Sequence, residues 1–485
     1  MSGQKPREIA AEVLNRLKSA RVCAQRGGGD LTTEDRALTD APNPGPLQAR
    51  GRDFVEDLLD AALAKAQISA ADRRLCQELA YGVVRWKATL DWLIARKVQH
   101  KAPNPRLQNL LRLGLYQIFW LERIPNHAAV HETVELAKRA GFHAQAGFVN
   151  AMLRGYLREF KATRDLLADL KSKQPAIGFS HPEWLVARWQ DRWGAQKAAQ
   201  LMEWNNNPPK TFARVNLLKA EPGKLLAQWR EEGVDYEFVR RDWIEENLVF
   251  EIKSNRSLRE LPSFQQGLFY VQDPSTLLAV RLLDPRPGES VLDLCAAPGG
   301  KLSFIAQLMG NQGRLVAHDT APERLKLLEE NCARLGVTSV ETTSSLPFSF
   351  KVQGSKFKVQ CSAYPPGAST LDPRPSILFD RILVDAPCSN TGTMRRRVDL
   401  RWRIRPEEIE RMRGLQLELL RQAAELLLPE GALVYSTCSL EPEENSSVVR
   451  QFLRERNEFD LEAERELVPF VNEVDGAYIA RLRKP

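Results

Sequence analysis

The sequence predicts a multidomain protein with an all-α N-terminal domain, a small α+β segment and a C-terminal α/β domain. Its 485 residues suit roughly two to four domains of ordinary size. Apolar residues near the N-terminus recur at helical spacing, whereas strand-like apolar runs alternate with helices toward the C-terminus. Such alternation is typical of a doubly wound, mostly parallel sheet. We therefore divide the chain into residues 1–163, 164–262 and 263–485.

The N-terminal segment is predicted to be helical because its apolar residues keep to one face of a helix. The clearest runs comprise Ile9, Ala10, Val13, Leu14 and Leu17, and Leu107, Leu110, Leu111, Leu115 and Ile118. The pattern stops at residues 24–50, where the glycines of 27–29 and the prolines of 42–46 cannot continue a helix. We expect a loop there, inserted into the helical domain.

The middle and C-terminal segments contain short strands. In the middle segment we expect strands at 212–216, 235–239 and 248–252 and a helix at 222–232. In the C-terminal segment, strands are predicted at 290–294, 314–319, 381–385 and 432–436, with helices opening at Gly299-Gly300-Lys301 and covering 323–335 and 406–428. These βα units predict an open, mostly parallel sheet.

Composition limits the class of protein. With 43% hydrophobic residues the chain can bury a core, which excludes global disorder. No run approaches the ~18 apolar residues that cross a bilayer, so we expect no membrane association. Seven widely spaced cysteines argue against a disulfide framework and favour a reducing compartment, so we expect a cytoplasmic protein. The net charge of +7 is compatible with a polyanionic partner but is weak support alone.

A loop of small residues follows the first strand of the predicted parallel sheet. It reads Asp293-Leu294-Cys295-Ala296-Ala297-Pro298-Gly299-Gly300-Lys301. Small residues let a ligand approach the backbone, and the helix that follows offers free N–H groups. The spacing matches neither the dinucleotide nor the phosphate-binding glycine motif. Asp319, at the end of the second strand, can accept hydrogen bonds from both hydroxyls of a ribose. The alternative is a tight turn and a surface carboxylate.

Two cysteines follow neighbouring strands of the same sheet. Asp385-Ala386-Pro387-Cys388 ends one strand and Ser436-Thr437-Cys438 ends the next, so both thiols are expected at one edge, beside the small-residue loop. A thiolate is a strong nucleophile toward a soft, electron-poor carbon. Two cysteines with no histidine nearby fall short of the usual four metal ligands, so we expect no metal. A disulfide, or two buried structural cysteines, are the other interpretations.

These motifs, in this order, closely resemble the RNA (cytosine-5) methyltransferases that use S-adenosyl-L-methionine. The resemblance rests on residues 293–301, 385–388 and 436–439, with support from 272–275, 441–445 and Asp475-Gly476-Ala477-Tyr478. The helical segment resembles NusB-type RNA-binding domains at 110–116, 129–138 and 148–154. The combination is that of the RsmB (Fmu/Sun) family, which methylates a cytidine of bacterial 16S ribosomal RNA. The resemblance implies a NusB-like domain, an RNA-recognition-like α+β extension and a Rossmann-like methyltransferase domain.

The family's residue roles carry over onto matching positions. The resemblance makes Cys438 the nucleophile that attacks carbon 6, Cys388 the residue that assists release, and Asp385 the group at the pyrimidine ring. It assigns cofactor binding to Cys295, Ala296, Ala297, Pro298, Gly299, Gly300, Lys301, Asp319 and Asp385. Reasoning from the residues alone does not decide which thiol attacks.

The chain departs from the family pattern after the third strand. The family places an aspartate near the adenine there, but this chain reads Glu341-Thr342-Thr343-Ser344-Ser345. A hydroxyl or backbone group is the expected replacement. The stretch 343–377, with its prolines, reads as a second insert.

An arginine-rich stretch follows the first of the two cysteines. It contains Arg395, Arg396, Arg397, Arg401 and Trp402. Arginines contact phosphates and bases, and tryptophan offers a stacking face, so we expect these residues to contact single-stranded RNA. The alternative is that these residues form a solvent-exposed segment that leads into a helix.

The sequence favours an enzyme that methylates carbon 5 of a cytidine in 16S ribosomal RNA, free or in a partly assembled small subunit. We expect a monomer. The same chemistry on transfer RNA is one alternative. A non-catalytic RNA-binding factor in ribosome assembly is another, against which the intact cysteine pair argues.

Overall fold

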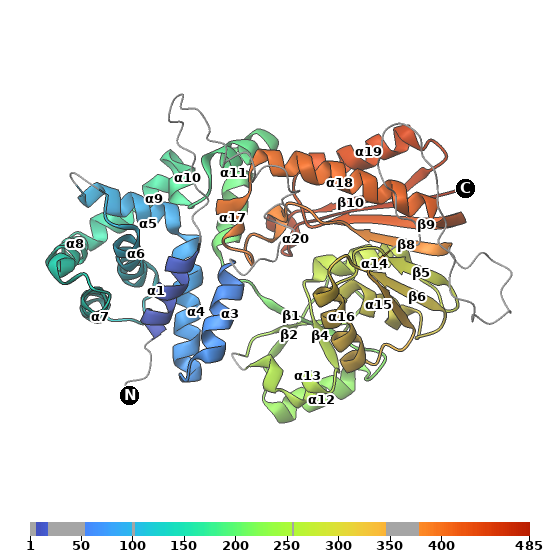
Figure 1. Ribbon diagram of the computed structural model, residues 1–485, viewed down its shortest axis with the longest axis horizontal. Coiled ribbons are helices and arrows are strands. Elements are labelled where there is room, and N and C mark those ends of the chain that lie inside the picture. The colour runs from blue at the N-terminus through green and yellow to red at the C-terminus, as the bar shows by residue number, and fades with distance from the viewer. Residues whose placement is uncertain (1–5, 18–53, 99–101, 255–256, 346–377) are drawn as a thin grey trace, which may run out of the picture. The chain divides into compact units, whose positions relative to one another are not determined.

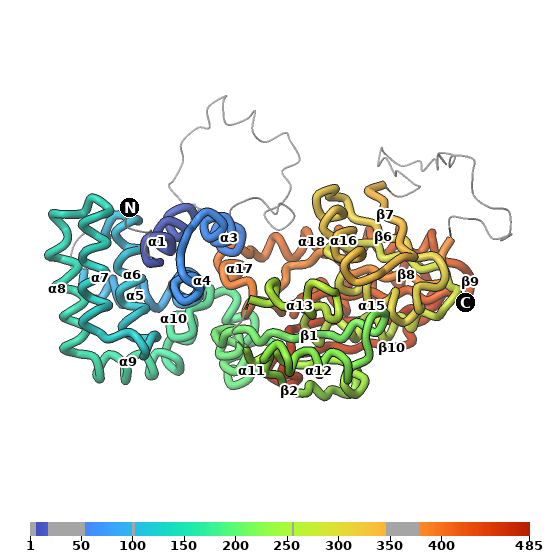
Figure 2. The backbone as a smooth tube through the Cα atoms, turned by 90° about the horizontal axis from the view of Figure 1, so that it is seen from below, coloured from blue at the N-terminus to red at the C-terminus, as the bar shows by residue number. Residues whose placement is uncertain are grey.

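The computed structural model describes residues 6–17, 54–98, 102–254, 257–345 and 378–485 (Figures 1 and 2). The predicted loop at 24–50 and most of the predicted insert at 343–377 lie outside the described residues. The chain divides into two compact units. The first comprises residues up to Pro208 together with Met394–Ile404, and the second comprises Pro209–Thr393 and Arg405–Pro485. The rest of the predicted α+β segment and the predicted α/β segment thus share the second unit, and the helices between 164 and 208 belong to the first.

The first unit is helical throughout the residues described, as its apolar spacing predicts. Its helices are α1 (Pro6–Arg16), α3 (Val55–Lys65), α4 (Ala70–Arg85), α5 (Lys87–Lys97), α6 (Pro105–Trp120), α7 (Asn126–Arg139), η1 (His143–Gln145), α8 (Ala146–Arg158), α9 (Phe160–Lys173), α10 (Pro175–Gly178), α11 (Glu183–Asn206) and α17 (Leu400–Arg403). The side chains predicted to face inward, such as Ile9, Leu110 and Leu111, are buried in one apolar core. No helix in the described ranges is long and apolar enough to cross a membrane.

A segment from the C-terminal half of the chain, Met394–Ile404, completes this helical unit. The fully buried guanidinium of Arg401 donates to the carbonyl oxygens of Arg85, Ser180 and Asn205 and to Oδ1 of Asn206. Burial lowers the pKa of Arg401 to about 9. Because no carboxylate neutralises the guanidinium in these contacts, the helical unit holds it with oriented carbonyl dipoles.

Neighbouring residues of the segment are held in the same way. The indole N–H of Trp402 donates to the carbonyl oxygen of Val84, and the Asp399 carboxylate accepts from the backbone N–H of Val55. The guanidinium carbon of Arg395 lies 4.0 Å from the ring centroid of Trp204. In this structure the polar or stacking groups of Arg395, Arg401 and Trp402, which the sequence predicts to contact RNA, bind the helical unit itself. Arg396 is half-buried and Arg397 is exposed.

The second unit begins with a small antiparallel sheet. Its strands are β1 (Thr211–Val215), β2 (Tyr236–Phe238), β3 (Val249–Ile252) and β4 (Phe269–Val271), in the order β2-β3-β1-β4, with α12 (Pro222–Glu232), η2 (Leu258–Glu260) and α13 (Pro262–Gln265). The predicted α12 has the expected bounds, and the left-handed Gly233 ends it. The buried Trp229 of α12 packs its ring against Phe250 and Phe269 of the sheet. The predicted α+β character of this segment is confirmed.

A larger sheet of seven strands forms the rest of the second unit. Its order is β10-β11-β9-β8-β5-β6-β7. The strands are β5 (Ser290–Asp293), β6 (Arg314–His318), β7 (Val340–Thr343), β8 (Phe379–Asp385), β9 (Leu427–Thr437), β10 (Asp460–Leu467) and β11 (Ala477–Arg483). The five strands from β7 to β9 are parallel, as predicted, and β11 and β10 extend the sheet antiparallel.

Alternate residues of the parallel strands face two separate apolar cores. One core lies between the sheet and three helices, α14 (Leu277–Leu283), which follows η3 (Pro274–Thr276), α15 (Gly300–Leu308) and α16 (Pro322–Leu335). The strands contribute to it Val291, Leu315, Leu383 and Val434. Leu292, Val316, Ile382 and Leu433 pack with α18 (Pro406–Glu425) and α19 (Ser446–Glu455). Figure 1 shows these two helical layers on opposite faces of the sheet. The period of two in the strands therefore produces a three-layer α/β domain, as the fold class predicts.

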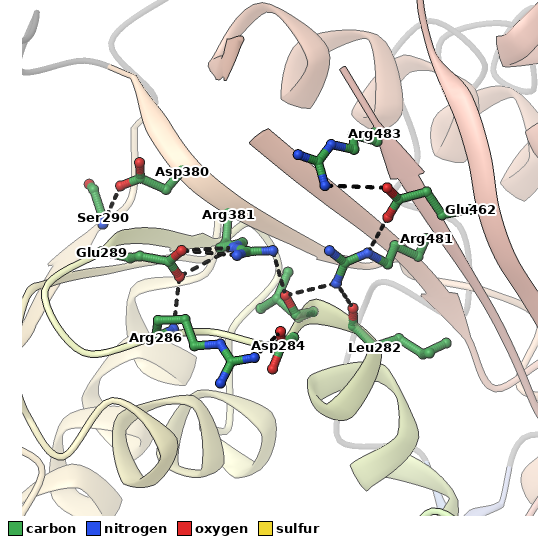
Figure 3. Close-up of polar contacts among 11 residues, drawn as sticks. Leu282, Asp284, Arg286, Glu289, Ser290, Asp380, Arg381, Glu462, Arg481 and Arg483 are labelled. Atoms are coloured by element: carbon green, nitrogen blue, oxygen red, sulfur yellow. Dashed lines mark hydrogen bonds and ion pairs between the residues drawn. The ribbon is translucent and has the colours of Figure 1, made fainter. Parts of the chain in front are cut away.

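Two arginines of the sheet anchor the end of α14 (Figure 3). Arg381 of β8 and Arg481 of β11 both donate to the carbonyl oxygen of Leu283. Glu289 forms an ion pair with Arg381, and Glu462 forms one with Arg481. These guanidinium groups satisfy helix carbonyls that would otherwise lack partners and so fix α14 against the sheet.

The buried guanidinium of Arg401 should stabilise the helical unit strongly. In the variant Arg401→Met the carbonyl oxygens of Arg85, Ser180 and Asn205 lose their charged donor inside the fold. We expect the free energy of unfolding to fall by about 3 kcal/mol. Urea unfolding monitored by circular dichroism measures this change.

The exposed Arg397 provides the matched control because it lies on the same segment. We expect Arg397→Met to change the free energy of unfolding by less than about 0.5 kcal/mol. Equal losses in the two variants would contradict the structural role of Arg401.

Candidate active site

The order of the parallel strands reverses beside β5 of the large sheet. From β5 the chain proceeds outward to β6 and β7, whereas β8, the other neighbour of β5, leads to β9 on the opposite side. Ligands bind at such a switch in strand order, beyond the carboxyl ends of the strands. The small-residue loop after Asp293 follows β5, Asp385 ends β8, and Cys438 follows β9. With Asp319 after β6, the predicted site residues of the second unit come from four adjacent strand ends.

The two cysteines that the sequence singles out lie side by side. The Sγ atoms of Cys388 and Cys438 are 3.3 Å apart, and both cysteines are free. Cys388 is buried, whereas Cys438 is partly exposed. The Cys438 thiol also lies 3.1 Å from Oδ1 of Asn390, which can accept a hydrogen bond from it. The more accessible sulfur is thus the one after β9.

The electrostatics of the pair distinguish the two thiols. The hydrogen bond with Cys438 and then burial raise the pKa of Cys388 well above its usual value, and the charges of Cys438 and Glu444 act in the same direction. Cys388 is therefore held as a protonated thiol that can donate to the neighbouring sulfur. Cys76 and Cys332 are buried within apolar cores, where burial raises the pKa of each thiol to about 11. Such thiols are inert.

The carboxylate of Asp385 lies between a lysine and a serine. Its Oδ2 forms an ion pair with Nζ of Lys301 at 2.7 Å, and its Oδ1 accepts from Oγ of Ser436 at 2.8 Å. Burial opposes the charge on Lys301, but the Asp385 carboxylate and its hydrogen bond outweigh burial and raise the pKa of Lys301. The charge of Cys438 also acts on Lys301 in this direction. A fixed ammonium group therefore lies within electrostatic reach of the more accessible thiol.

Asp293, the last residue of β5, contributes a second acid to this edge. It is buried, and its Oδ1 has no hydrogen-bond partner within the described part of the chain. Burial and then the charge of Asp385 raise the pKa of Asp293 to about 8, although Lys301 opposes this shift. An unsatisfied carboxyl oxygen here can receive a donor or a positive charge from a ligand.

The small-residue loop is tightly packed, which explains its two glycines. Gly299 has a φ of 97°, a conformation that favours glycine. A Cβ atom on Gly300 would lie 3.0 Å from Cε1 of Tyr270, so a larger residue would press on that side chain. The helix α15 begins directly after this loop and leaves its first N–H groups free of intrahelical partners.

Asp319 lies at the end of β6, next to the loop. It is almost fully buried, accepts from the backbone N–H of Ala321 and forms an ion pair with Arg324 at 3.0 Å. Arg324 also donates to the carbonyl oxygen of Ala297 in the loop. The donor set fits S-adenosyl-L-methionine: an acid for the ribose hydroxyls, a close backbone approach and an unsatisfied buried carboxyl oxygen at Asp293.

The end of β7, where the sequence lacks the expected aspartate, carries hydroxyl groups. The backbone N–H of Asp319 donates to the carbonyl oxygen of Thr343, and Oγ1 of Thr343 donates to the carbonyl oxygen of Ser345. These residues adjoin Asp319 and are the described groups available in place of the aspartate. Among the residues that the structure describes, no group of three or more His, Cys, Asp or Glu side chains is arranged to hold a metal ion.

Several residues of the site have no role in the sequence-based prediction. Asn390 contacts Cys438, and Ser436 holds Asp385. Ser389, Ser439 and Glu444 form a buried cluster beside the two thiols. The sequence signal for them is weak, because serine and asparagine are common in loops and only an acid close after Cys438 hints at a buried partner.

Three matches to known families cover most of the chain. Residues 280–483 match the family described as 16S rRNA methyltransferase RsmB/F. Residues 37–158 match the NusB family, and residues 181–251 match the ferredoxin-like domain described as Methyltr_RsmF/B-like. The helical unit, the small sheet and the parallel sheet thus each have a named counterpart.

Individual relatives cover nearly the whole chain. A Bacillus subtilis protein named probable ribosomal RNA small subunit methyltransferase B is 36% identical over 88% of this chain and 94% of its own length. A Klebsiella pneumoniae protein named ribosomal RNA small subunit methyltransferase B is 34% identical over 86% of this chain and 91% of its own. The crystal structure of a methyltransferase homologue from Pyrococcus horikoshii matches with a TM-score of 0.51 and 31% identity, over 64% of this chain and 97% of its own. The chain therefore belongs to the RsmB/F family of methyltransferases, as the resemblance of its sequence motifs implies.

Proposed function

We propose that this protein transfers a methyl group from S-adenosyl-L-methionine to carbon 5 of a cytidine in 16S ribosomal RNA, through a covalent bond between Cys438 and carbon 6. The observation that carries the proposal is the pair of free thiols 3.3 Å apart beside the Lys301–Asp385 ion pair. Carbon 5 of cytosine is a poor nucleophile until a thiolate has added to carbon 6, so two thiols and an acid-base group at one edge suit this chemistry.

Cys438 suits the attacking role better than Cys388. It is the more exposed of the two thiols, Cys388 can donate a hydrogen bond to it, and the Lys301 ammonium favours its negative charge. The sulfur of Cys438 is therefore accessible to a base and has a hydrogen-bond donor and a positive charge nearby. Attack forms the Cys438–carbon 6 bond and moves an electron pair onto the ring, which makes carbon 5 nucleophilic.

The Lys301–Asp385 pair suits the polar edge of the pyrimidine. An ammonium group donates hydrogen bonds to ring acceptors and a carboxylate accepts from an exocyclic amine, so together they orient the base and stabilise the electron-rich adduct. Ser436 fixes the carboxylate through its second oxygen. Residues 294–300, Asp293 and Asp319 would hold the cofactor, which supplies an electrophilic methyl group when bound.

Cys388 suits the release step. In the adduct Cys438 is a neutral thioether, so the hydrogen bond and the charge that raise the pKa of Cys388 are lost. Its proton then passes more readily to water, and the resulting thiolate can accept the proton of carbon 5 directly or through a water molecule. Loss of that proton returns the electron pair to the ring and breaks the Cys438–carbon 6 bond, which regenerates the free Cys438 thiolate.

The choice of ribosomal RNA as substrate rests on the relatives. Those at 34–36% identity are named for the ribosomal RNA small subunit, and the helical unit matches the NusB family. Arg396 and Arg397, which follow the Cys388 loop, remain proposed RNA contacts.

Replacing Cys388 should trap the enzyme on its substrate. In Cys388→Ala the attack by Cys438 still occurs, but removal of the carbon 5 proton is slowed, so a covalent RNA–protein complex accumulates. An unmodified 16S ribosomal RNA transcript with labelled S-adenosyl-L-methionine, followed by denaturing electrophoresis, measures it.

Two controls accompany this experiment. The double variant Cys388→Ala/Cys438→Ala should form no complex, and Cys332→Ala, which alters a core thiol, should turn over like the unchanged protein. A complex that persists in the double variant would contradict attack by Cys438.

The substrate is tested independently by bisulfite sequencing of total RNA from cells with and without the gene. We expect one cytidine of 16S ribosomal RNA to lose its protection when the gene is deleted. Loss of protection in transfer RNA instead would overturn the ribosomal assignment while keeping the chemistry. No change in any RNA would favour a non-catalytic assembly factor.

A further inference from the structure

A fully buried carboxylate lies behind the two thiols. Glu444 ends the short helix η5 (Pro442–Glu444), which follows Cys438 in the chain. None of its surface is exposed, and the same is true of Ser389 and Ser439. Burying a carboxylate is costly unless strong donors surround it. The function proposed above gives this residue no role.

The donors around Glu444 come from both cysteine loops. Its Oε1 accepts from the backbone N–H of Ser389 at 2.7 Å and from Nε2 of Gln416 at 3.1 Å. Its Oε2 accepts from the hydroxyl groups of Ser389 and Ser439, the latter at 2.5 Å. Ser389 follows Cys388 directly, and Ser439 follows Cys438 directly. One carboxylate therefore ties together the residues next to the two thiols.

Other contacts fix Glu444 itself. The phenol of Tyr435, a residue of β9, donates to its carbonyl oxygen at 2.5 Å. Gln416 of α18 also donates to the carbonyl oxygen of Pro387, the residue before Cys388. Burial raises the pKa of Glu444, and its hydrogen bonds from Ser389, Ser439 and Gln416 oppose that shift. The carboxylate is thus a rigid link between the strand, the long helix and both loops.

We propose that Glu444 is a positioning residue that sets the spacing of the two thiols by holding Ser389 and Ser439 on one carboxylate. The inference rests on the proposed function, because spacing matters only if both thiols act in turn. Attack on carbon 6 needs Cys438 alone. Release needs Cys388 within reach of the adduct, so disturbing the link should slow release more than attack.

The variant Glu444→Gln separates these steps. A carboxamide retains one accepting oxygen but turns an NH₂ group toward donors, so one of the two loops loses its anchor. We expect the steady-state fraction of covalent RNA–protein complex to rise about tenfold above that of the unchanged protein, with turnover reduced accordingly. The assay uses the full-length chain, an unmodified 16S ribosomal RNA transcript and labelled S-adenosyl-L-methionine.

A second variant guards against general loss of folding. Ser389→Ala removes one hydroxyl from the same carboxylate while it keeps the backbone N–H contact. We expect complex to accumulate in this variant too, to a smaller extent. The effects of Ser389→Ala and Glu444→Gln should not add in the double variant, because both act through one link. Glu443→Gln, at the adjacent residue, is the matched control and should behave like the unchanged protein.

The outcomes distinguish the positioning role of Glu444 from the proposed function on which it rests. If Cys388→Ala traps RNA but neither Glu444→Gln nor Ser389→Ala does, the positioning role is wrong and the proposed function stands. If Cys388→Ala traps nothing, the proposed function fails first. Equal losses of attack and release, with no accumulation, would make Glu444 merely structural.

Discussion

The approach of two thiols at the ends of neighbouring parallel strands is the constraint on which the site depends. β8 and β9 pair in parallel so that Asp385 lies opposite Ser436. Cys388 lies three residues after the end of β8, and Cys438 directly follows β9. The two Sγ atoms therefore lie 3.3 Å apart. The same register places Ser436 where it can fix the Asp385 carboxylate. Strand pairing thus sets the positions of both thiols and of the Asp385 carboxylate.

Their surroundings make the two thiols, Cys388 and Cys438, different from one another. One thiol is buried, shares its hydrogen bond with the other and has a raised pKa, whereas the other is partly exposed near an ammonium group. These distinct surroundings suit the distinct roles that we propose for the two cysteines. The buried carboxylate of Glu444 adds a mechanical link because it binds the residue after each cysteine. Spacing and protonation are therefore set by different parts of the fold.

Much of this architecture could be predicted from the sequence because its signals are local. Helical spacing identified the helical unit, and the apolar runs at 290–294 and 381–385 fall within or beside β5 and β8. The strand β10 escaped prediction because it forms the edge of the sheet and most of its residues are polar and at least partly exposed. The strand β11 lies between β10 and β9 and is largely buried, but its continuous apolar run is short. The carboxyl ends of neighbouring parallel strands lie at one edge of a sheet, so residues that follow them can be predicted to lie together. For this reason both cysteines, Asp385 and the small-residue loop could be predicted as site residues.

Contacts between distant parts of the chain could not be predicted. Arg395, Arg401 and Trp402 read as an exposed basic and aromatic stretch, yet the polar or stacking groups of all three bind the helical unit. Glu444 reads as one acid among several in a loop, and only the structure places Ser389 against it. A single sequence carries no signal for such pairings, since each depends on segments at least 50 residues apart.

Identifying the residue that is bonded to RNA tests attack by Cys438 most directly. Cytidine with fluorine at carbon 5 cannot lose a proton there, so an RNA transcript that contains it should remain attached to the unchanged protein after methyl transfer. Protease and nuclease digestion followed by mass spectrometry locates the bond. We expect a modified Cys438. A bond at Cys388, or methylation of 16S ribosomal RNA without any covalent complex, would contradict it.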